Sequence, residues 1–294
     1  MGVPGAIATW AVEGPDGWVL IEAGPERCWP ELVRGLDTLG LAPSDLAAVL
    51  VTHIHLDHAG AAWRLAAEGV PIHVHEFGVQ HLVDPSRLLR SAKRIYGDRM
   101  DALWGQLEPC PAELVHAATD GTDVDVAGLR FRAVETPGHA RHHHAWSLER
   151  IEPATCFTGD AAAMLIPGTP WISLPMPPPE LDVDAWHASL DRLEAGHWTR
   201  LCLTHGGMVQ GAAIGQHLDA VRASLDSQVQ FITDLQASET DPSARQATYR
   251  QWLLESAQAA EIEESRFDQY VSSGLLGMNL SGVARYLEQR ASSS

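Results

Sequence analysis

Three histidines and an aspartate stand within six consecutive positions, since residues 53–58 read His-Ile-His-Leu-Asp-His. A neutral imidazole offers a nitrogen lone pair and a carboxylate offers an anionic oxygen, and these donors suit zinc, iron or manganese far better than calcium or magnesium. Because a chain that turns out of a strand can aim its residues in different directions, His53 and His55 could bind one ion while Asp57 and His58 face a second. Histidines that cap a helix or fill polar core positions are the structural alternative, and the density of the cluster argues against it.

Three further candidate ligands occur later, each after a short apolar strand and beside small residues that allow the backbone to turn. They are His139 in Glu-Thr-Pro-Gly-His, Asp160 in Cys-Phe-Thr-Gly-Asp and His205 in Leu-Cys-Leu-Thr-His. With residues 53–58 they make a set of five histidines and two aspartates.

The order of these motifs resembles the metallo-beta-lactamase superfamily, whose hallmark is a His-x-His-x-Asp-His loop followed by a distant His, Asp and His. The resemblance covers about residues 15 to 215. It implies two divalent metal ions, with zinc as the first expectation and iron or manganese as alternatives. It also implies a ligand for each motif position: His53, His55 and His139 for the first metal, Asp57, His58 and His205 for the second, and Asp160 as the bridge.

The same resemblance implies a hydrolytic mechanism in which Asp57 and Asp160 are catalytic residues. A carboxylate between two cations screens their repulsion, and a water in the same gap loses a proton near neutral pH because both charges stabilise hydroxide. That hydroxide is the expected nucleophile. We therefore predict a dinuclear hydrolase of a small ester, thioester or lactone, similar to the glyoxalase II-like branch.

Two alternatives come from other functional classes. Persulfide dioxygenases share the fold and use a single iron held by two His and one Asp, which would make the protein an oxidoreductase. A non-catalytic metal-binding protein is the second alternative, and the complete ligand set argues against it. Hydroxyacylglutathione hydrolases commonly hold the glutathione carboxylate with a C-terminal Arg-x-x-Lys, whereas no lysine follows Lys93 here.

The chain departs from the superfamily pattern at the end of its second predicted strand. The superfamily often has Asp-Thr-Gly there, whereas residues 22–24 read Glu-Ala-Gly. We expect Glu22 to make similar outer-shell hydrogen bonds with its longer side chain.

A basic stripe and a histidine triplet are candidates for substrate recognition. Arg87, Arg90 and Arg94 share one face of a predicted helix, with Lys93 beside it, in a chain of formal net charge -18. The stripe could attract an anionic substrate, although an ordinary solvated helix face is the alternative. The predicted substrate-binding residues are Arg90, Lys93, Arg94, Tyr96, His142 and His143.

The charge and hydrophobicity of the chain limit the classes of partner that we expect. A net charge of -18 argues against nucleic-acid binding, which draws affinity from clustered Lys and Arg. No run of eighteen apolar residues and no export-signal pattern is present, so we expect a cytoplasmic protein without a membrane partner. A small-molecule substrate and a possible homodimer complete these expectations.

The elements that must position the candidate ligands follow from hydrophobic periodicity. We predict a hairpin from residues 6–12 and 18–22, strands at 46–52 and 71–75, and helices at 29–39, 59–68 and 184–194. The fold class is α/β, a four-layered αββα sandwich. A catalytic domain at 1–215 would carry a helical insertion at about 84–110, and an extension at 216–294 would hold helices at 216–235, 244–265 and 281–290. The proline-rich loop at 166–179 could form a wall of the substrate pocket, with a packed connection as the alternative.

Overall fold

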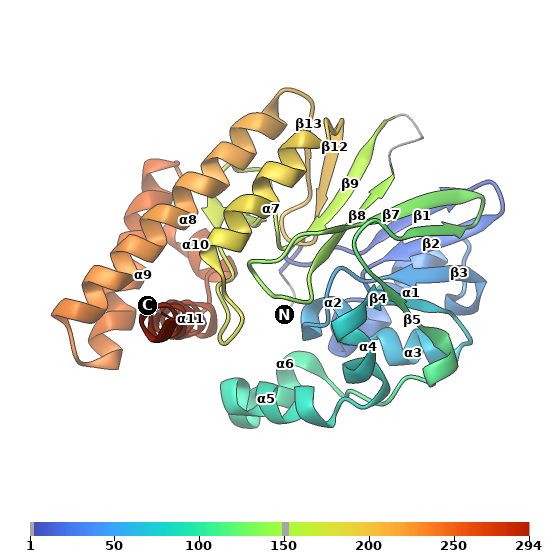
Figure 1. Cartoon of the computed structure of the whole chain (residues 1–294), viewed down its shortest axis with the longest axis horizontal. Coiled ribbons are helices and arrows are strands. Elements are labelled where there is room, and N and C mark those ends of the chain that lie inside the picture. The colour runs from blue at the N-terminus through green and yellow to red at the C-terminus, as the bar shows by residue number, and fades with distance from the viewer. Residues whose placement is uncertain (1–2, 149–152, 294) are drawn as a thin grey trace.

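Two β-sheets lie face to face, with helices on both outer faces (Figure 1). The structure is a computed structural model and describes residues 3–148 and 153–293. The first sheet has five strands in the order β1-β2-β3-β4-β5. They are β1 (Trp10–Gly14), β2 (Gly17–Ile21), β3 (Leu46–Leu50), β4 (Ile72–His75) and β5 (Val115–Ala118).

The second sheet has six strands in the order β13-β12-β9-β8-β7-β6. They are β6 (Asp123–Val126), β7 (Leu129–Glu135), β8 (His144–Leu148), β9 (Thr155–Gly159), β12 (Arg200–Leu203) and β13 (Met208–Gln210). A separate two-stranded ribbon pairs β10 (Met164–Leu165) with β11 (Ile172–Ser173). Strands β2, β3, β4 and β5 run parallel, as do β9 and β12, so several strands deliver their carboxyl ends to one edge of the sandwich.

The central core forms because strand residues alternate between the two faces of a sheet. On β3, Ala48 and Leu50 face the second sheet, while Val49 faces the outer helices. On β8, Trp146 packs between the sheets and Ala145 packs against the opposite layer. The predicted four-layered αββα arrangement is therefore confirmed.

The helices of the N-terminal half cover the first sheet or form the insertion at its edge. They are α1 (Trp29–Asp37), α2 (Leu56–Ala59), α3 (Ala62–Ala67), α4 (Glu76–Val83), α5 (Ser86–Tyr96) and α6 (Met100–Trp104). Short 3-10 turns lie at Glu26–Cys28, Pro43–Asp45, Gly97–Arg99 and Ala112–Leu114.

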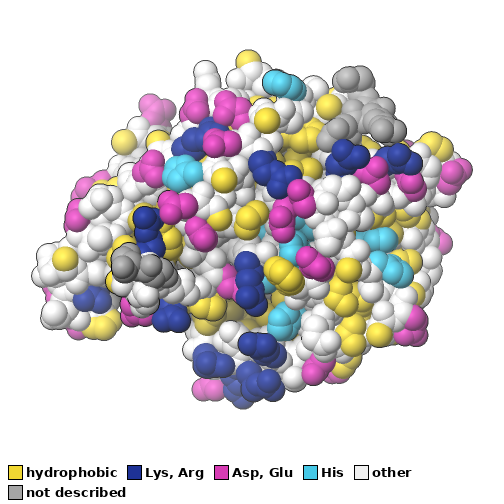
Figure 2. Space-filling model, viewed as in Figure 1, with side chains coloured by type: hydrophobic (Ala, Val, Ile, Leu, Met, Phe, Trp, Pro, Cys, Tyr) yellow, Lys and Arg dark blue, Asp and Glu magenta, His cyan; other side chains and the backbone are white. Residues whose placement is uncertain are grey.

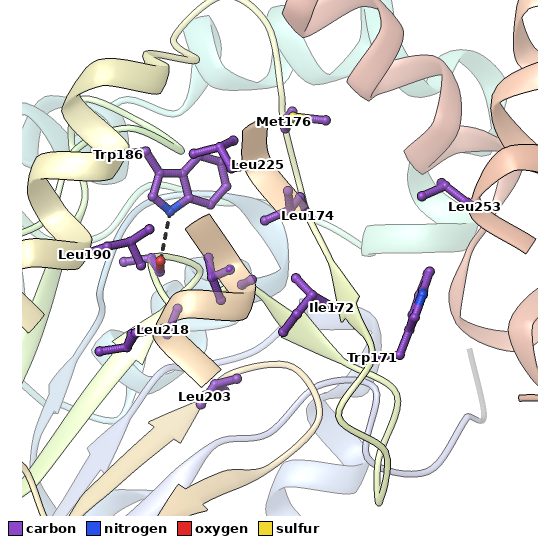
Figure 3. Close-up of a cluster of buried hydrophobic side chains, with 14 of the residues drawn as sticks. Trp171, Ile172, Leu174, Met176, Trp186, Leu190, Leu203, Leu218, Leu225 and Leu253 are labelled. Atoms are coloured by element: carbon purple, nitrogen blue, oxygen red, sulfur yellow. Dashed lines mark hydrogen bonds between the residues drawn. The ribbon is translucent and has the colours of Figure 1, made fainter. Parts of the chain in front are cut away.

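The helices of the C-terminal half pack on the second sheet. They are α7 (Val183–Ala195), α8 (Ala213–Ser238), α9 (Pro242–Ala259), α10 (Glu264–Tyr270) and α11 (Ser273–Ser293). Their apolar side chains join those of the sheet in one buried cluster, in which Trp186 Nε1 donates a hydrogen bond to the Ala161 carbonyl over 2.8 Å (Figure 3). The predicted division at residue 215 remains a prediction, although both parts contribute to this core.

Several predicted boundaries differ from the structure. The predicted helix 244–265 is two helices, α9 and α10, because Glu261 between them has a left-handed φ of 60°, which interrupts helical hydrogen bonding. The predicted helix 59–68 is also two, α2 and α3, and begins earlier, so that Asp57 and His58 are themselves helical. The predicted hairpin is confirmed, with Gly14 opposite Gly17, but its first strand begins only at Trp10.

Among the described residues, none of the helices combines the length and apolar character needed to cross a bilayer.

Candidate metal centre

The candidate ligands converge at the edge where strands of both sheets end. His53 and His55 lie in the loop after β3, and Asp57 and His58 lie on α2 directly after that loop. Asp160 follows β9, His205 follows β12, and His139 lies in the connection between β7 and β8. The structure thus brings together side chains from four separate segments, as the motif order predicts.

One group of three imidazoles forms around His55. Its Nδ1 lies 2.9 Å from His53 Nε2 and 2.8 Å from His139 Nε2. These three potential ligand atoms lie within 4.8 Å of one another. Three nitrogens so close together could hold one cation, because each can direct a lone pair at the same point.

A second group combines Asp57, His58 and His205, whose potential ligand atoms also lie within 4.8 Å of one another. Asp160 lies between the two groups. Its Oδ2 is 3.3 Å from His139 Nε2, and its Oδ1 is 3.4 Å from both His58 Nε2 and His205 Nε2. One carboxylate therefore presents one oxygen to each group.

The chemistry of these side chains fits metal ions. His58 Nε2 and Asp160 Oδ1 are both buried, and neither has a partner with hydrogen-bond geometry in the described part of the chain. Buried polar atoms are almost always satisfied, so such a pair at the centre of a histidine cluster is what a metal-binding site would present. The residues present can accommodate the metals that the sequence predicts.

The ring nitrogens that face away from the centre are held by groups behind them. His53 Nδ1 lies 3.0 Å from Thr52 Oγ1, His58 Nδ1 2.9 Å from Glu22 Oε1, His139 Nδ1 2.8 Å from the Pro175 carbonyl, and His205 Nδ1 2.6 Å from the Ala6 carbonyl. A proton on each Nδ1 leaves the Nε2 lone pair free for a metal and fixes the ring orientation.

Glu22 connects three segments of the site. Its carboxylate is 1% exposed and accepts hydrogen bonds from the Thr52 amide at 3.1 Å and the Thr52 hydroxyl at 2.6 Å. It also accepts from Thr204 Oγ1 at 3.1 Å and His58 Nδ1 at 2.9 Å. The hydrogen bonds that the sequence leads us to expect from Glu22 to the metal-ligand loop are present. The residue adopts a φ of 66°, an uncommon conformation for a side chain of this size.

Burial and charge set the protonation of the cluster. Burial, reinforced by neighbouring imidazoles, holds the pKa values of His53 and His55 well below the ordinary value. Burial also acts to lower the pKa of His58, but the negative charges of Asp160, Glu22 and Asp57 together raise it well above its ordinary value. Burial disfavours the charged form of Asp160, yet His58, His139 and His205 keep its pKa well below the usual range. Without metal, the centre thus contains neutral imidazoles at His53 and His55, a protonated imidazole at His58 and an ionised carboxylate at Asp160.

A cavity of about 380 Å³ opens above the cluster, and His55, Asp57, His139 and Asp160 form part of its lining. Three of the predicted substrate-binding residues also line it: Arg94, Tyr96 and His142. Burial, and to a lesser degree Asp57, raises the pKa of the Tyr96 hydroxyl, which therefore keeps its proton. Burial lowers the pKa of His142 to about 3, so its imidazole is neutral.

The other three predicted substrate contacts lie elsewhere. Arg90 and Lys93 belong to α5 but are not part of the cavity lining. His143 is fully buried: its Nδ1 lies 2.8 Å from Thr136 Oγ1, and its Nε2 accepts a hydrogen bond from the Asp160 amide at 3.2 Å. With both ring nitrogens engaged, His143 supports the loop that carries Asp160 instead of facing a substrate.

The cavity also contains residues that the sequence motifs do not single out. Arg141 and Glu180 form an ion pair at 3.1 Å, and Glu180 also lies 3.3 Å from His142 Nε2. Arg141 stands only two residues after His139 in the sequence, and this proximity was the available indication that it lies near the site. Met278 of α11 also lines the cavity, and nothing in its local sequence indicates this.

Comparison with known proteins yields one family by sequence. The metallo-beta-lactamase superfamily matches residues 2–205. A metallo-beta-lactamase fold-containing protein of Sulfurisphaera tokodaii is 26% identical over 185 residues, which are 62% of this chain and 68% of that protein. A hydroxyacylglutathione hydrolase of Xylella fastidiosa is 27% identical over 227 residues, 75% of this chain and 68% of that enzyme. An atrochrysone carboxyl ACP thioesterase of Aspergillus fumigatus is 32% identical over 143 residues, 48% of this chain but 35% of that enzyme.

Solved structures agree on the fold. A metallo-beta-lactamase family protein from Thermus thermophilus superposes with a TM-score of 0.69 at 20% identity, over 97% of this chain and 89% of that chain. A protein solved in a di-iron-bound form superposes with a TM-score of 0.52 at 26% identity, over 72% of this chain and 92% of that chain.

Proposed function

Because the chain belongs to the metallo-beta-lactamase superfamily, whose match spans residues 2–205, we propose that it is a metal-dependent hydrolase of a small ester, thioester or lactone. Two divalent metal ions, with zinc as the first expectation, would be held by the two groups of side chains around His55 and His58. When bound, they would polarise the scissile carbonyl and lower the pKa of a water, which supplies a hydroxide nucleophile.

The observation that carries this proposal is the position of Asp160. Its two oxygens lie 3.3 Å from a nitrogen of one group and 3.4 Å from nitrogens of the other. A shared carboxylate of this kind reduces the repulsion between two cations, and the same centre faces a cavity large enough for a small substrate.

The chain's own residues have separate tasks in the reaction. Tyr96 retains its proton and lines the cavity, so it can donate a hydrogen bond to the oxygen on which negative charge develops. The Arg141–Glu180 pair and neutral His142 form a polar wall that can orient the substrate. Ile54, Leu88 and Ile95 supply apolar lining that limits access of bulk water.

Substrate charge is the second part of the proposal. Figure 2 shows Lys and Arg side chains gathered over α5, on a surface that otherwise carries many acidic groups. Arg87 and Arg94 of this helix line the cavity. We propose that they bind an anionic group at the end of the substrate remote from the scissile bond, because cations beside a cleft attract and orient anions.

Thioesters are the first class to test, since two relatives are named as a hydroxyacylglutathione hydrolase and an ACP thioesterase. The experiment combines metal quantification with a panel of thioesters, including lactoylglutathione, together with lactones, phosphodiesters and persulfides. We expect about two metals per chain and thioester or lactone hydrolysis that is lost in His55→Ala. About one iron per chain with oxygen uptake on persulfides would replace the hydrolase proposal with the dioxygenase alternative.

The proposed binding of an anionic group by Arg87 and Arg94 is tested with the substrate of this panel that the protein hydrolyses. Charge reversal at Arg87 and Arg94 together should raise KM for an anionic thioester about tenfold, or ~1.4 kcal/mol, with little effect on a neutral one. The matched control reverses Arg90 and Lys93 on the same helix, which lie outside the cavity lining. An equal rise in KM for both pairs that disappears at high salt would reduce the role of α5 to general attraction.

A further inference from the structure

The C-terminal helix α11 contacts the loop that lies behind one of the candidate ligands. Asn279 of this helix is only 2% exposed. Its Oδ1 accepts a hydrogen bond from the Met176 amide at 2.8 Å, and its Nδ2 donates to the Leu174 carbonyl at 2.8 Å. One side-chain amide therefore holds the backbone on both sides of Pro175.

The Pro175 carbonyl is the acceptor that orients His139. His139 Nδ1 donates to this carbonyl over 2.8 Å, and both groups are buried. On the other side of the ring, His139 Nε2 lies 2.8 Å from His55 Nδ1 and 3.3 Å from Asp160 Oδ2. Because the imidazole ring is rigid, a displacement of the carbonyl would turn Nε2 away from the point where the ligand atoms meet.

The loop itself has few means of fixing this carbonyl. Residues 175 and 177–179 are prolines, which lack an amide N–H and cannot donate to a neighbouring strand. The helix also approaches closely: a Cβ at Gly282, one turn after Asn279, would lie 1.9 Å from the Met176 carbonyl oxygen. Helix α11 thus supports the loop through a close backbone approach and through two hydrogen bonds from Asn279.

We propose that Asn279 is a positioning residue for the metal centre, acting through Pro175 on His139. The inference rests on the proposed metal site and goes beyond it, because it gives the C-terminal helices a part in metal affinity as well as in folding. The path joins residues that are 140 positions apart in the sequence, from His139 to Asn279.

The test measures metal affinity by competition with a chelator, without reference to turnover. Asn279→Leu, of similar size, removes both hydrogen bonds to the loop and should weaken binding at the site containing His139 by about 10–100-fold. The cobalt(II) absorption spectrum of that site should change as well. Asn279 Nδ2 also donates to the Tyr249 hydroxyl at 3.2 Å, and this hydroxyl donates to Gln228 Oε1 of α8 at 2.6 Å. Gln228→Leu is therefore the matched control, since Gln228 is also 2% exposed and its replacement disturbs the same buried network without removing a hydrogen bond to the loop.

We expect Gln228→Leu to lower stability while keeping wild-type metal affinity and the wild-type cobalt spectrum. Asn279→Asp, which keeps an acceptor for the Met176 amide but loses the amide donor, should fall between wild type and Asn279→Leu and decides the question if the leucine variant does not fold. Wild-type affinity and spectrum in a folded Asn279 variant would overturn the inference alone. A wild-type protein that binds no metal would instead remove the proposed function, and this inference with it.

Discussion

Replacing Glu22 by glutamine offers a sharp test of how the metal centre is supported. The carboxylate accepts four hydrogen bonds: one at Oε2, from the Thr52 amide, and three at Oε1, from Thr52 Oγ1, Thr204 Oγ1 and His58 Nδ1. A glutamine of the same shape can keep its oxygen at the Oε1 position. Its NH2 group then faces the Thr52 amide N–H, so that two hydrogen-bond donors oppose each other in the protein interior and neither has an acceptor there.

The magnitude follows from this geometry. Leaving one buried donor without an acceptor costs about 1–3 kcal/mol, which should appear in the free energy of unfolding of the metal-free protein. Loss of the carboxylate behind His58 should weaken metal binding by about 10–100-fold, because an outer-shell carboxylate orients a ligating imidazole and increases its basicity. Chelator competition and urea unfolding measure the two effects separately.

Glu26→Gln provides the control for Glu22→Gln. Glu26 is also a poorly exposed carboxylate with several donors, accepting from Arg64 Nε at 2.8 Å and from the Gln106 amide at 3.0 Å, but it lies outside the ligand cluster. We expect it to lose stability and retain metal affinity. If Glu22→Gln were destabilised yet bound metal as tightly as wild type, Glu22 would contribute to folding only. The inferred support of metal binding by its carboxylate would then be refuted.

Three other predictions concern protons and packing. Zinc loading near pH 7 should release about one proton from His58, whose raised pKa keeps it protonated until the metal arrives; titration calorimetry in two buffers that gives no buffer-dependent heat would contradict this. The metal-free protein should lose stability as the pH falls below about 6.5, because burial holds the pKa values of His142 and His144 at about 3 and only the unfolded chain then binds these protons. Each contributes a slope of about 1.4 kcal/mol per pH unit, and a flat unfolding free energy between pH 6.5 and 4 would rule this out. Trp186→Phe should lower the free energy of unfolding by about 1–3 kcal/mol, measured with urea, because the Ala161 carbonyl loses its donor; unchanged stability would mean that water replaces the bond.

The rotation of α5 about its own axis explains why only some of the predicted substrate-binding residues of this helix line the cavity. The spacing of Arg87, Arg90 and Arg94 puts them on one broad face of α5, but the boundary of the cavity crosses that face, so Arg87 and Arg94 line it and Arg90 does not. The orientation of a helix about its axis depends on packing, here of Leu88 and Ala92 against neighbouring apolar groups. No local pattern contains that rotation.

The ligand types and their association with strand ends could be recognised from the sequence, because metal-binding donors are few and because a parallel sheet brings the carboxyl ends of its strands to one edge. The local context of each motif and the resemblance to the family were together sufficient to point to the residues that meet around Asp160. The supporting contacts required the tertiary structure: the bonds from Thr204 and His58 to Glu22, the turn of His143 toward the Asp160 amide, and the hold of Asn279 on the loop behind His139. These contacts join distant segments through ordinary hydrogen-bonding groups, which leave no signature in the chain until folding brings them within about 3 Å of one another.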